Sequence, residues 1–340
     1  MYSTHVNTGS YGCNKMTKYF CRLTCADNQH TRKSIHFCLK EYRFLCCQCT
    51  FHSAYLKYTF SCISCFRSYC VIHFIQHKEE LIHFFKANQL NIYDPCTKFL
   101  KKVSLKNWVE STSDTISCHG KIYIIGGNLT DNVHEVDIQN KSLILKGNML
   151  CKKYEQALCT KGSYIISIGG IGTNMNGALR DCQQYSTARN KWVSLPNMLC
   201  QRSEPAVFNF DNVYIYLFGG WIRKDAFSNT VERLGFRSKK WEELKTYNEP
   251  SPRYELHGMQ INKHRAIIYG SYPCPEESFL LEFHSKFVKF IKGPHLAMRA
   301  EFYRTSSPVF DGAHLYDVDY QKNIHFYDSN TEIWKIIKLN

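Results

Sequence analysis

The sequence predicts a mainly β protein, in which a β-propeller of five or six four-stranded blades follows a small zinc-binding domain rich in cysteine and histidine. Three observations predict this organisation: a glycine-pair repeat, a regular spacing of aromatic residues after each repeat, and a concentration of cysteines near the N-terminus. They divide the 340 residues into segments 1–48, 49–88 and 89–340.

A strand-like hydrophobic run followed by two glycines recurs along the C-terminal three quarters of the chain. The pairs end at Gly127, Gly170 and Gly220, at intervals of 43 and 50 residues. Degenerate versions of the motif, which lack one or both glycines, end at Gly270 and Asp317 and continue the same period. Periods of about 40–50 residues with β character are typical of propeller blades.

Each repeat unit contains four strand-like runs. In the second unit the apolar run 164–168 precedes the glycine pair, and Tyr185 and Trp192 follow it, seven positions apart and separated by a turn. The same spacing joins Tyr327 to Trp334, Leu234 to Trp241 and Val136 to Leu143.

A glycine pair after a hydrophobic strand, followed by Tyr and Trp at this spacing, resembles the kelch motif over about residues 90–340. The resemblance implies a propeller in which the glycines permit tight turns and the aromatic rings fill the space between blades. The blade count stays open at five or six. Residues 91–95 and 97–100 look like the outer half of another blade, and residues 80–86 are candidates for one of its missing strands.

Ten of the 17 cysteines lie in the first 70 residues, and an odd total excludes complete pairing in disulfides. The N-terminus lacks the apolar region of a signal peptide, and no run approaches the roughly 18 apolar residues of a membrane span. We therefore expect a cytoplasmic protein, with a nuclear location as the alternative. In a reducing compartment a cysteine and histidine cluster indicates metal binding rather than disulfides.

Eight cysteine and histidine residues in segment 49–88 have the order and spacing of zinc ligands, beginning with three pairs whose members are separated by two residues. This pattern resembles the B-box zinc-binding domain, although His73 stands where the family usually has cysteine. The resemblance implies two structural Zn²⁺ ions, each held by four protein ligands. One ion would be held by Cys49, His52, Cys70 and His73, and the other by Cys62, Cys65, His77 and His83. Residues 81–85 also fit a β-strand.

The remaining cysteines form two groups. Those in residues 13–46 either form a further, degenerate zinc module or serve as buried thiols, because their spacing matches no known pattern. Those after residue 90 are scattered, which favours buried thiols in the propeller core.

The sequence predicts a non-enzymatic adaptor that binds a partner protein through the propeller. It contains no phosphate-binding glycine loop, nucleophile elbow or metalloprotease helix motif, and a zinc ion with four protein ligands has no open position for water. The kelch and B-box resemblances leave a substrate-recruiting component of a ubiquitin ligase as one alternative. RNA or anionic-surface binding is the other, because residues 1–89 hold 11 Lys and Arg against four Asp and Glu.

Overall fold

The computed structural model describes residues 60–61, 68–69, 82–86, 88–95, 98–107, 109, 112–127, 130–173, 177–224, 226–270, 272–300, 302 and 308–339. In these ranges the chain forms β-strands and no helix. It divides into two compact units, Met1–Glu79 and Glu80–Asn340. In the first unit the described residues form one antiparallel pair, β1 (Phe60–Ser61) with β2 (Ser68–Tyr69). Segment 1–48 lies outside the described residues.

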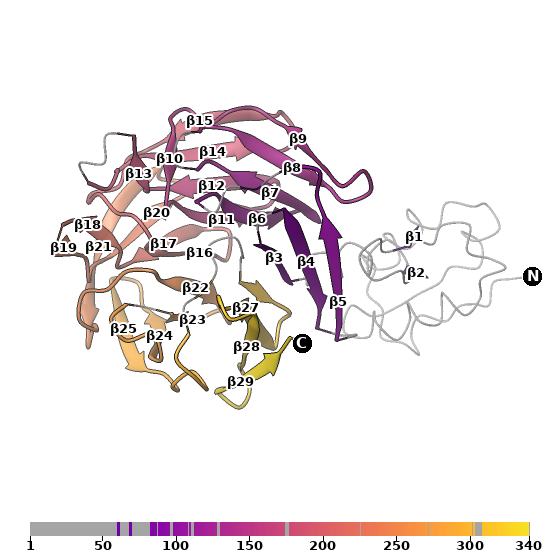
Figure 1. Cartoon of the computed structure of the whole chain (residues 1–340). Helices are drawn as coiled ribbons and strands as arrows, with labels where there is room; N and C mark the ends of the chain where they lie inside the picture. Colours follow the sequence, from indigo (N-terminus) through magenta and orange to yellow (C-terminus); the bar gives the residue numbers. More distant parts are fainter. Residues whose placement is uncertain are drawn as a thin grey trace, which may run out of the picture. The chain divides into compact units, whose positions relative to one another are not determined.

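The second unit consists of antiparallel strands that mostly pair with their neighbours in the sequence (Figure 1). The first sheet has three strands, β3 (Ile82–Lys86), β4 (Gln89–Asp94) and β5 (Phe99–Ser104). The next has four, β6 (Asp114–Cys118), β7 (Lys121–Ile125), β8 (Val133–Asp137) and β9 (Ser142–Leu145). A third contains β11 (Ala157–Lys161), β12 (Tyr164–Ile168), β14 (Cys182–Ser186) and β15 (Lys191–Leu195).

The largest sheet has eight strands. Its first half contains β16 (Ala206–Phe210), β17 (Tyr214–Phe218), β20 (Val231–Gly235) and β21 (Lys240–Tyr247). Its second half contains β22 (His257–Gln260), β23 (Arg265–Tyr269), β24 (Ser278–Phe283) and β25 (Phe287–Lys292). The last sheet contains β26 (Val309–Phe310), β27 (His314–Val318), β28 (Asn323–Asp328) and β29 (Ile333–Lys338). Two short pairs join β10 (Lys153–Tyr154) to β13 (Ile171–Gly172), and β18 (Trp221–Arg223) to β19 (Ala226–Phe227).

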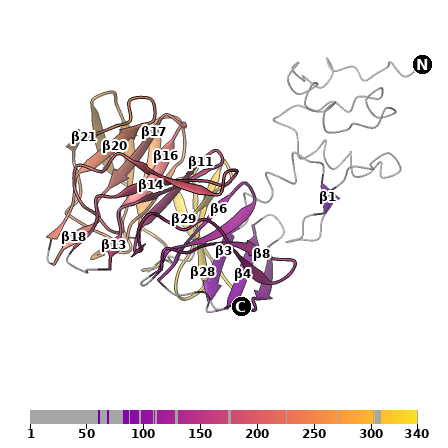
Figure 2. The same cartoon turned by 90° about the horizontal axis from the view of Figure 1, so that it is seen from above.

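Within the second unit, four sheets of four or more strands follow one another in a propeller-like arrangement, which Figure 2 shows from a second direction. The sheet count differs from the five or six separate four-stranded blades that the sequence predicts. Two features cause the difference. Residues Lys245–Tyr247 of β21 pair in parallel with Phe287–Lys289 of β25, which joins two four-stranded meanders into one sheet. The sheet β3–β5 has three strands among the described residues.

The seven-residue aromatic spacing is the spacing of cross-strand partners. Tyr185 lies directly opposite Trp192, and Tyr327 opposite Trp334. The Trp192 indole N–H donates to the Gly147 carbonyl, 3.0 Å away in the segment that follows the preceding sheet. The rings therefore fill the space between neighbouring sheets, as predicted.

The first and last sheets of this unit pack against each other, and their contact includes the further strands that the sequence indicated. Residues 91–95 and 97–100 fall in and around β4 and β5, where Tyr93 lies opposite Leu100. Ile82 and Phe84 of β3 share a hydrophobic cluster with Val318 of β27. This cluster brings the two ends of the unit together.

The scattered cysteines were predicted to be buried thiols. The buried ones in the described part of the chain are Cys118, Cys159 and Cys182, whereas Cys151, Cys200 and Cys274 are half-buried. Among the described residues no helix has the length and apolar character that crossing a membrane requires.

Candidate functional site: an acidic pocket

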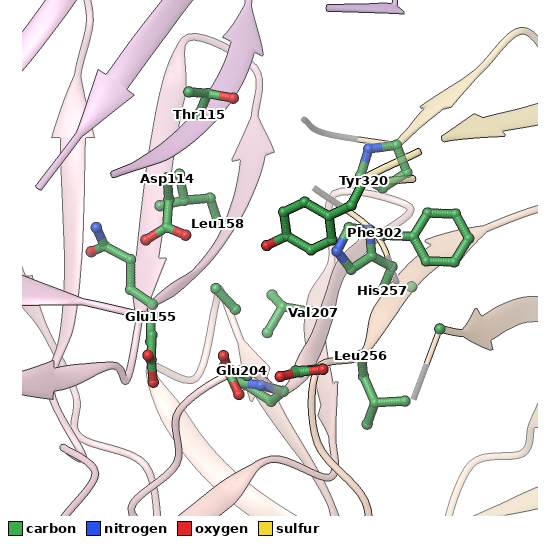
Figure 3. A pocket seen from close by; sticks show the side chains of 17 residues that line it. Asp114, Thr115, Glu155, Leu158, Glu204, Val207, Leu256, His257, Phe302 and Tyr320 are labelled. Carbon is green, nitrogen blue, oxygen red and sulfur yellow. The ribbon is translucent and has the colours of Figure 1, made fainter. Parts of the chain in front are cut away.

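A cavity of about 340 Å³ lies where the first strands of several sheets begin (Figure 3). Asp114 and Glu155 line one side, and Tyr320, His257 and Phe302 lie across from them. The segments before β6, β11, β16 and β22, or the starts of these strands, each contribute one carboxylate. These four residues are Asp114, Glu155, Glu204 and Glu255. Each also makes an electrostatic or hydrogen-bond contact within the protein.

Three of the four carboxylates belong to a repeated motif. A basic residue precedes each glutamate by two positions, in Lys153-x-Glu155, Arg202-x-Glu204 and Arg253-x-Glu255. The three glutamates have left-handed φ values of 56°, 53° and 54°. A positive φ is uncommon outside glycine, so its recurrence at equivalent positions shows that successive sheets place this residue in the same way.

The glycine pairs position these segments. The N–H of Gly170 donates to the Arg202 carbonyl at 2.9 Å, and the N–H of Gly220 donates to the Arg253 carbonyl at 2.9 Å. A Cβ built on Gly169 would overlap the Arg202 carbonyl oxygen. The glycines are therefore required because the backbone of the next unit passes in direct contact with them. Through this contact they place the glutamate two residues further on.

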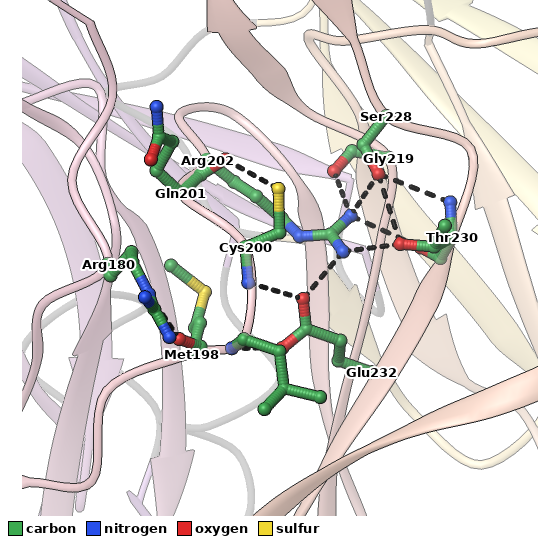
Figure 4. A network of polar contacts seen from close by, with 10 residues as sticks. Arg180, Met198, Cys200, Gln201, Arg202, Gly219, Ser228, Thr230 and Glu232 are labelled. Atoms are coloured by element: carbon green, nitrogen blue, oxygen red, sulfur yellow. Dashed lines mark hydrogen bonds and ion pairs between the residues drawn. The ribbon is translucent and has the colours of Figure 1, made fainter.

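The basic residue of each motif is buried and forms an ion pair. The guanidinium of Arg202 is fully buried and donates to the Gly219 carbonyl at 2.8 Å, to Ser228 Oγ at 2.6 Å and to Glu232 at 2.7 Å (Figure 4). The Glu232 carboxylate also accepts the backbone N–H of Leu199 at 2.8 Å. These bonds tie the connection that carries Glu204 to the neighbouring strands.

The other two motifs are held by similar pairs. Lys153 contacts Asp181 at 2.7 Å, and Arg253 contacts Glu277 at 3.3 Å. The arginine of the third motif is buried, like the lysine of the first. The three glutamates at the pocket therefore stand on connections that internal ion pairs fix in place.

His257 is the histidine of the pocket lining. Its Nδ1 lies within hydrogen-bond distance of the Asp317 carboxylate, which also accepts the Tyr269 hydroxyl at 2.8 Å. Burial lowers the pKa of His257, but the Asp317 charge and hydrogen bond outweigh this effect, with smaller contributions from Glu255 and Asp114. The pKa of His257 is therefore raised above its ordinary value.

Two aromatic rings line the pocket together with the carboxylates. The Phe302 ring contacts the His257 ring with centroids 5.5 Å apart, and Tyr320 is 51% exposed. The pocket region therefore combines negative charge with flat aromatic surface, a combination that suits a cationic group on an apolar stem.

Seven of the eight predicted zinc ligands, Cys49, His52, Cys62, Cys65, Cys70, His73 and His77, lie outside the described residues. The eighth, His83, lies in β3 and is buried. Its ring nitrogens lie 3.2 Å from Ser117 Oγ and 3.5 Å from Thr115 Oγ1 on β6. Burial lowers the pKa of His83 to about 4, so the ring is neutral near pH 7. In the described part of the chain no three His, Cys, Asp or Glu side chains are grouped to hold a metal ion.

The acidic pocket was not predicted from the sequence, although a signal for it exists. The basic-x-Glu motif recurs after 49 and 51 residues, close to the period of the glycine pairs. The motif alone does not tell where the glutamate side chains point. Its meaning depends on the convergence of β11, β16 and β22 around one cavity.

No protein-family model matches this sequence, and no curated protein sequence matches it. The kelch and B-box resemblances therefore rest on the motifs quoted above.

Proposed function

We propose that this protein is a non-enzymatic interaction adaptor whose acidic pocket accepts a lysine or arginine side chain of a partner protein. The propeller-like arrangement is compatible with a protein-interaction role, because it presents connections on a rigid frame. The observation that supports the proposal is the set of four carboxylates around the cavity. Charge-assisted hydrogen bonds to carboxylates are the strongest contacts available to such side chains.

The finer identity of the frame belongs to the same proposal. We assign the second unit to the kelch type and count each antiparallel meander as one blade. The eight-stranded sheet then contributes two blades and β3–β5 contributes one, which gives six in all.

A peptide library tests the binding role of the pocket. We expect the full chain to select peptides with Lys or Arg at one fixed position. We also expect the double substitution Glu204→Gln/Glu255→Gln to weaken the best peptide by about tenfold or more, because each lost charge removes a charge-assisted bond. Fluorescence anisotropy measures the affinities.

The matched control is Glu243→Gln/Glu249→Gln, which removes the same charge from exposed positions outside the pocket lining. This control should change the affinity by less than about twofold. A library without enrichment of basic residues would overturn the proposal. Equal losses in the two double variants would do the same, because they would assign the effect to net charge rather than to the pocket.

The raised pKa of His257 predicts a pH dependence of this binding. The imidazole carries a positive charge below its raised pKa and loses it above, so the pocket becomes more negative as the pH rises. We expect the affinity for an arginine peptide to increase about fivefold from about pH 6 to about pH 9. Arginine is the suitable probe because its own charge stays constant. The variant His257→Gln should bind with little pH dependence, and an unchanged pH profile would contradict the assignment to His257.

We also propose that the N-terminal segment is of B-box type and holds two structural Zn²⁺ ions. Because His83 lies in β3 against Thr115 and Ser117, the fourth ligand beside Cys62, Cys65 and His77 is a residue other than His83. Elemental analysis should find about two zinc ions per chain in protein purified without chelators. Cys62→Ser/Cys65→Ser should lower this to about one ion, because both residues belong to one predicted site. The control Cys151→Ser/Cys200→Ser, which changes half-buried cysteines of the second unit, should leave the zinc content unchanged. Finding no zinc would contradict this part.

A further inference from the structure

The connections at one end of three neighbouring meanders form a continuous surface. In an antiparallel meander the first and third connections lie at the same end, because successive strands run in opposite directions. Hydrogen bonds join these ends between meanders, from the Asn209 amide to the Thr160 carbonyl at 2.9 Å and from the Gln260 amide to Asp211 at 2.7 Å. We call this surface the turn face, and it comprises residues 161–163, 187–191, 211–213, 236–240, 261–264 and 284–286.

The turn face is strongly basic. Its exposed lysine and arginine residues are Arg189, Lys191, Arg237, Lys239, Lys240, Lys263 and Lys286. Its exposed acidic residue is Asp211, whose carboxylate accepts the Gln260 amide. The pocket lies at the opposite end of the same meanders, where the first strands begin, so the acidic pocket and the basic turn face lie at different ends.

Aromatic rings lie among and beside these cations: Phe236 is half-buried, His284 is exposed, and Phe287 directly follows the turn face. Lys161 Nζ lies 3.3 Å from the centroid of the Phe236 ring. The His284 ring stacks on Phe287 with centroids 4.2 Å apart. Many exposed basic side chains with an exposed, stacked ring among them match the two contacts that single-stranded nucleic acids offer, which are phosphates and base faces.

We propose that the turn face binds the phosphate backbone of a single-stranded nucleic acid. Its lysines and arginines neutralise phosphates, and the exposed His284 ring, which is stacked on Phe287, provides a surface on which a base can stack. An anionic membrane would favour large apolar side chains that protrude between the cations. In the described connections of the turn face, Val213 is the large apolar side chain that protrudes in this way. This proposal is independent of the partner that the acidic pocket accepts.

Binding of the full chain to a fluorescent 20-nucleotide single-stranded RNA or DNA at several salt concentrations tests the proposal. We expect the logarithm of the affinity to fall with the logarithm of the salt concentration with a slope of about −3, as for contacts with about four phosphates. The charge reversal Arg237→Glu/Lys239→Glu/Lys240→Glu should weaken binding by at least about tenfold and flatten the slope.

The control is Lys152→Glu/Arg223→Glu/Lys224→Glu, which makes the same charge change at exposed positions near the opposite end of the meanders. It should weaken binding by less than about threefold. The melting curves of both variants establish that each one folds. Absence of binding at low salt, or equal losses in the two variants, would overturn the proposal. Unchanged binding by the turn-face variant would also overturn the proposal, because it would place binding in the basic N-terminal segment. A preference for anionic lipid vesicles over the oligonucleotide would overturn it as well.

Discussion

Replacement of Arg202 with alanine is expected to destabilise the second unit by about 3–5 kcal/mol, the largest effect among the substitutions considered. The guanidinium is fully buried and pairs with Glu232, which is also fully buried, at 2.7 Å. Without Arg202 the Glu232 carboxylate stays in the interior with no counter-charge. The carbonyl of Gly219 also loses its side-chain donor, and Ser228 Oγ keeps the Thr230 N–H but loses the guanidinium. Urea unfolding, followed by tryptophan fluorescence, measures the loss.

Two further variants separate the buried charge from a general effect of losing a basic residue. Lys121→Ala removes a lysine that is 55% exposed and pairs with Glu135, and should cost less than about 1 kcal/mol. Arg202→Met/Glu232→Leu removes both buried charges and should recover part of the loss, because no carboxylate is left unpaired. If Arg202→Ala proves no more destabilising than Lys121→Ala, the Arg202–Glu232 ion pair does not hold in place the connection that carries Glu204.

Replacement of Gly169 with alanine is expected to cost about 3 kcal/mol. Two costs combine at this position. Its φ of 62° is left-handed, which disfavours any residue with a Cβ by roughly 1–2 kcal/mol. The new methyl group would also overlap the Arg202 carbonyl oxygen, and this backbone cannot withdraw without disturbing the buried ion pair.

Gly162 provides a matched control. Its φ of 51° is also left-handed, but no atom lies within 4 Å of the position that a Cβ would occupy. Gly162→Ala should therefore cost only the conformational term, roughly 1–2 kcal/mol. The difference between the two alanine variants measures the close approach of the Arg202 backbone. Equal losses of stability in the two variants would mean that Gly169 is needed only for its left-handed backbone conformation and not for the close approach of Arg202.

The parts of the fold that were predictable depend on local patterns. The spacing of Tyr185 and Trp192 specifies a hairpin with a four-residue connection, so the partner of each ring can be derived from the sequence alone. The glycine pairs mark the tight turns, because a glycine pair after a hydrophobic run is also visible in a short stretch of sequence. Of the predicted segment 80–86, residues Ile82–Lys86 form β3, because their apolar character shows in a short window.

The unpredicted parts depend on contacts between distant residues. The parallel pairing of β21 with β25 joins residues about 40 positions apart, and neither strand has a pattern that selects the other. Asp317 meets His257 across 60 positions. His83 has the spacing of a metal ligand in the sequence, but β3 places its ring against two hydroxyl groups of β6. Only the assembled sheets show which of these neighbours each side chain meets.

The most direct test of the acidic pocket is a charge reversal at the carboxylates that line it. The variant Glu204→Lys/Glu255→Lys, exposed to the same peptide library as the unaltered chain, should change its preference from Lys and Arg to Asp and Glu. This result requires the ligand to meet these two positions, because a distant effect would lower affinity without inverting the preference. Retention of the original preference for basic peptides would contradict the assignment of the pocket as the binding site.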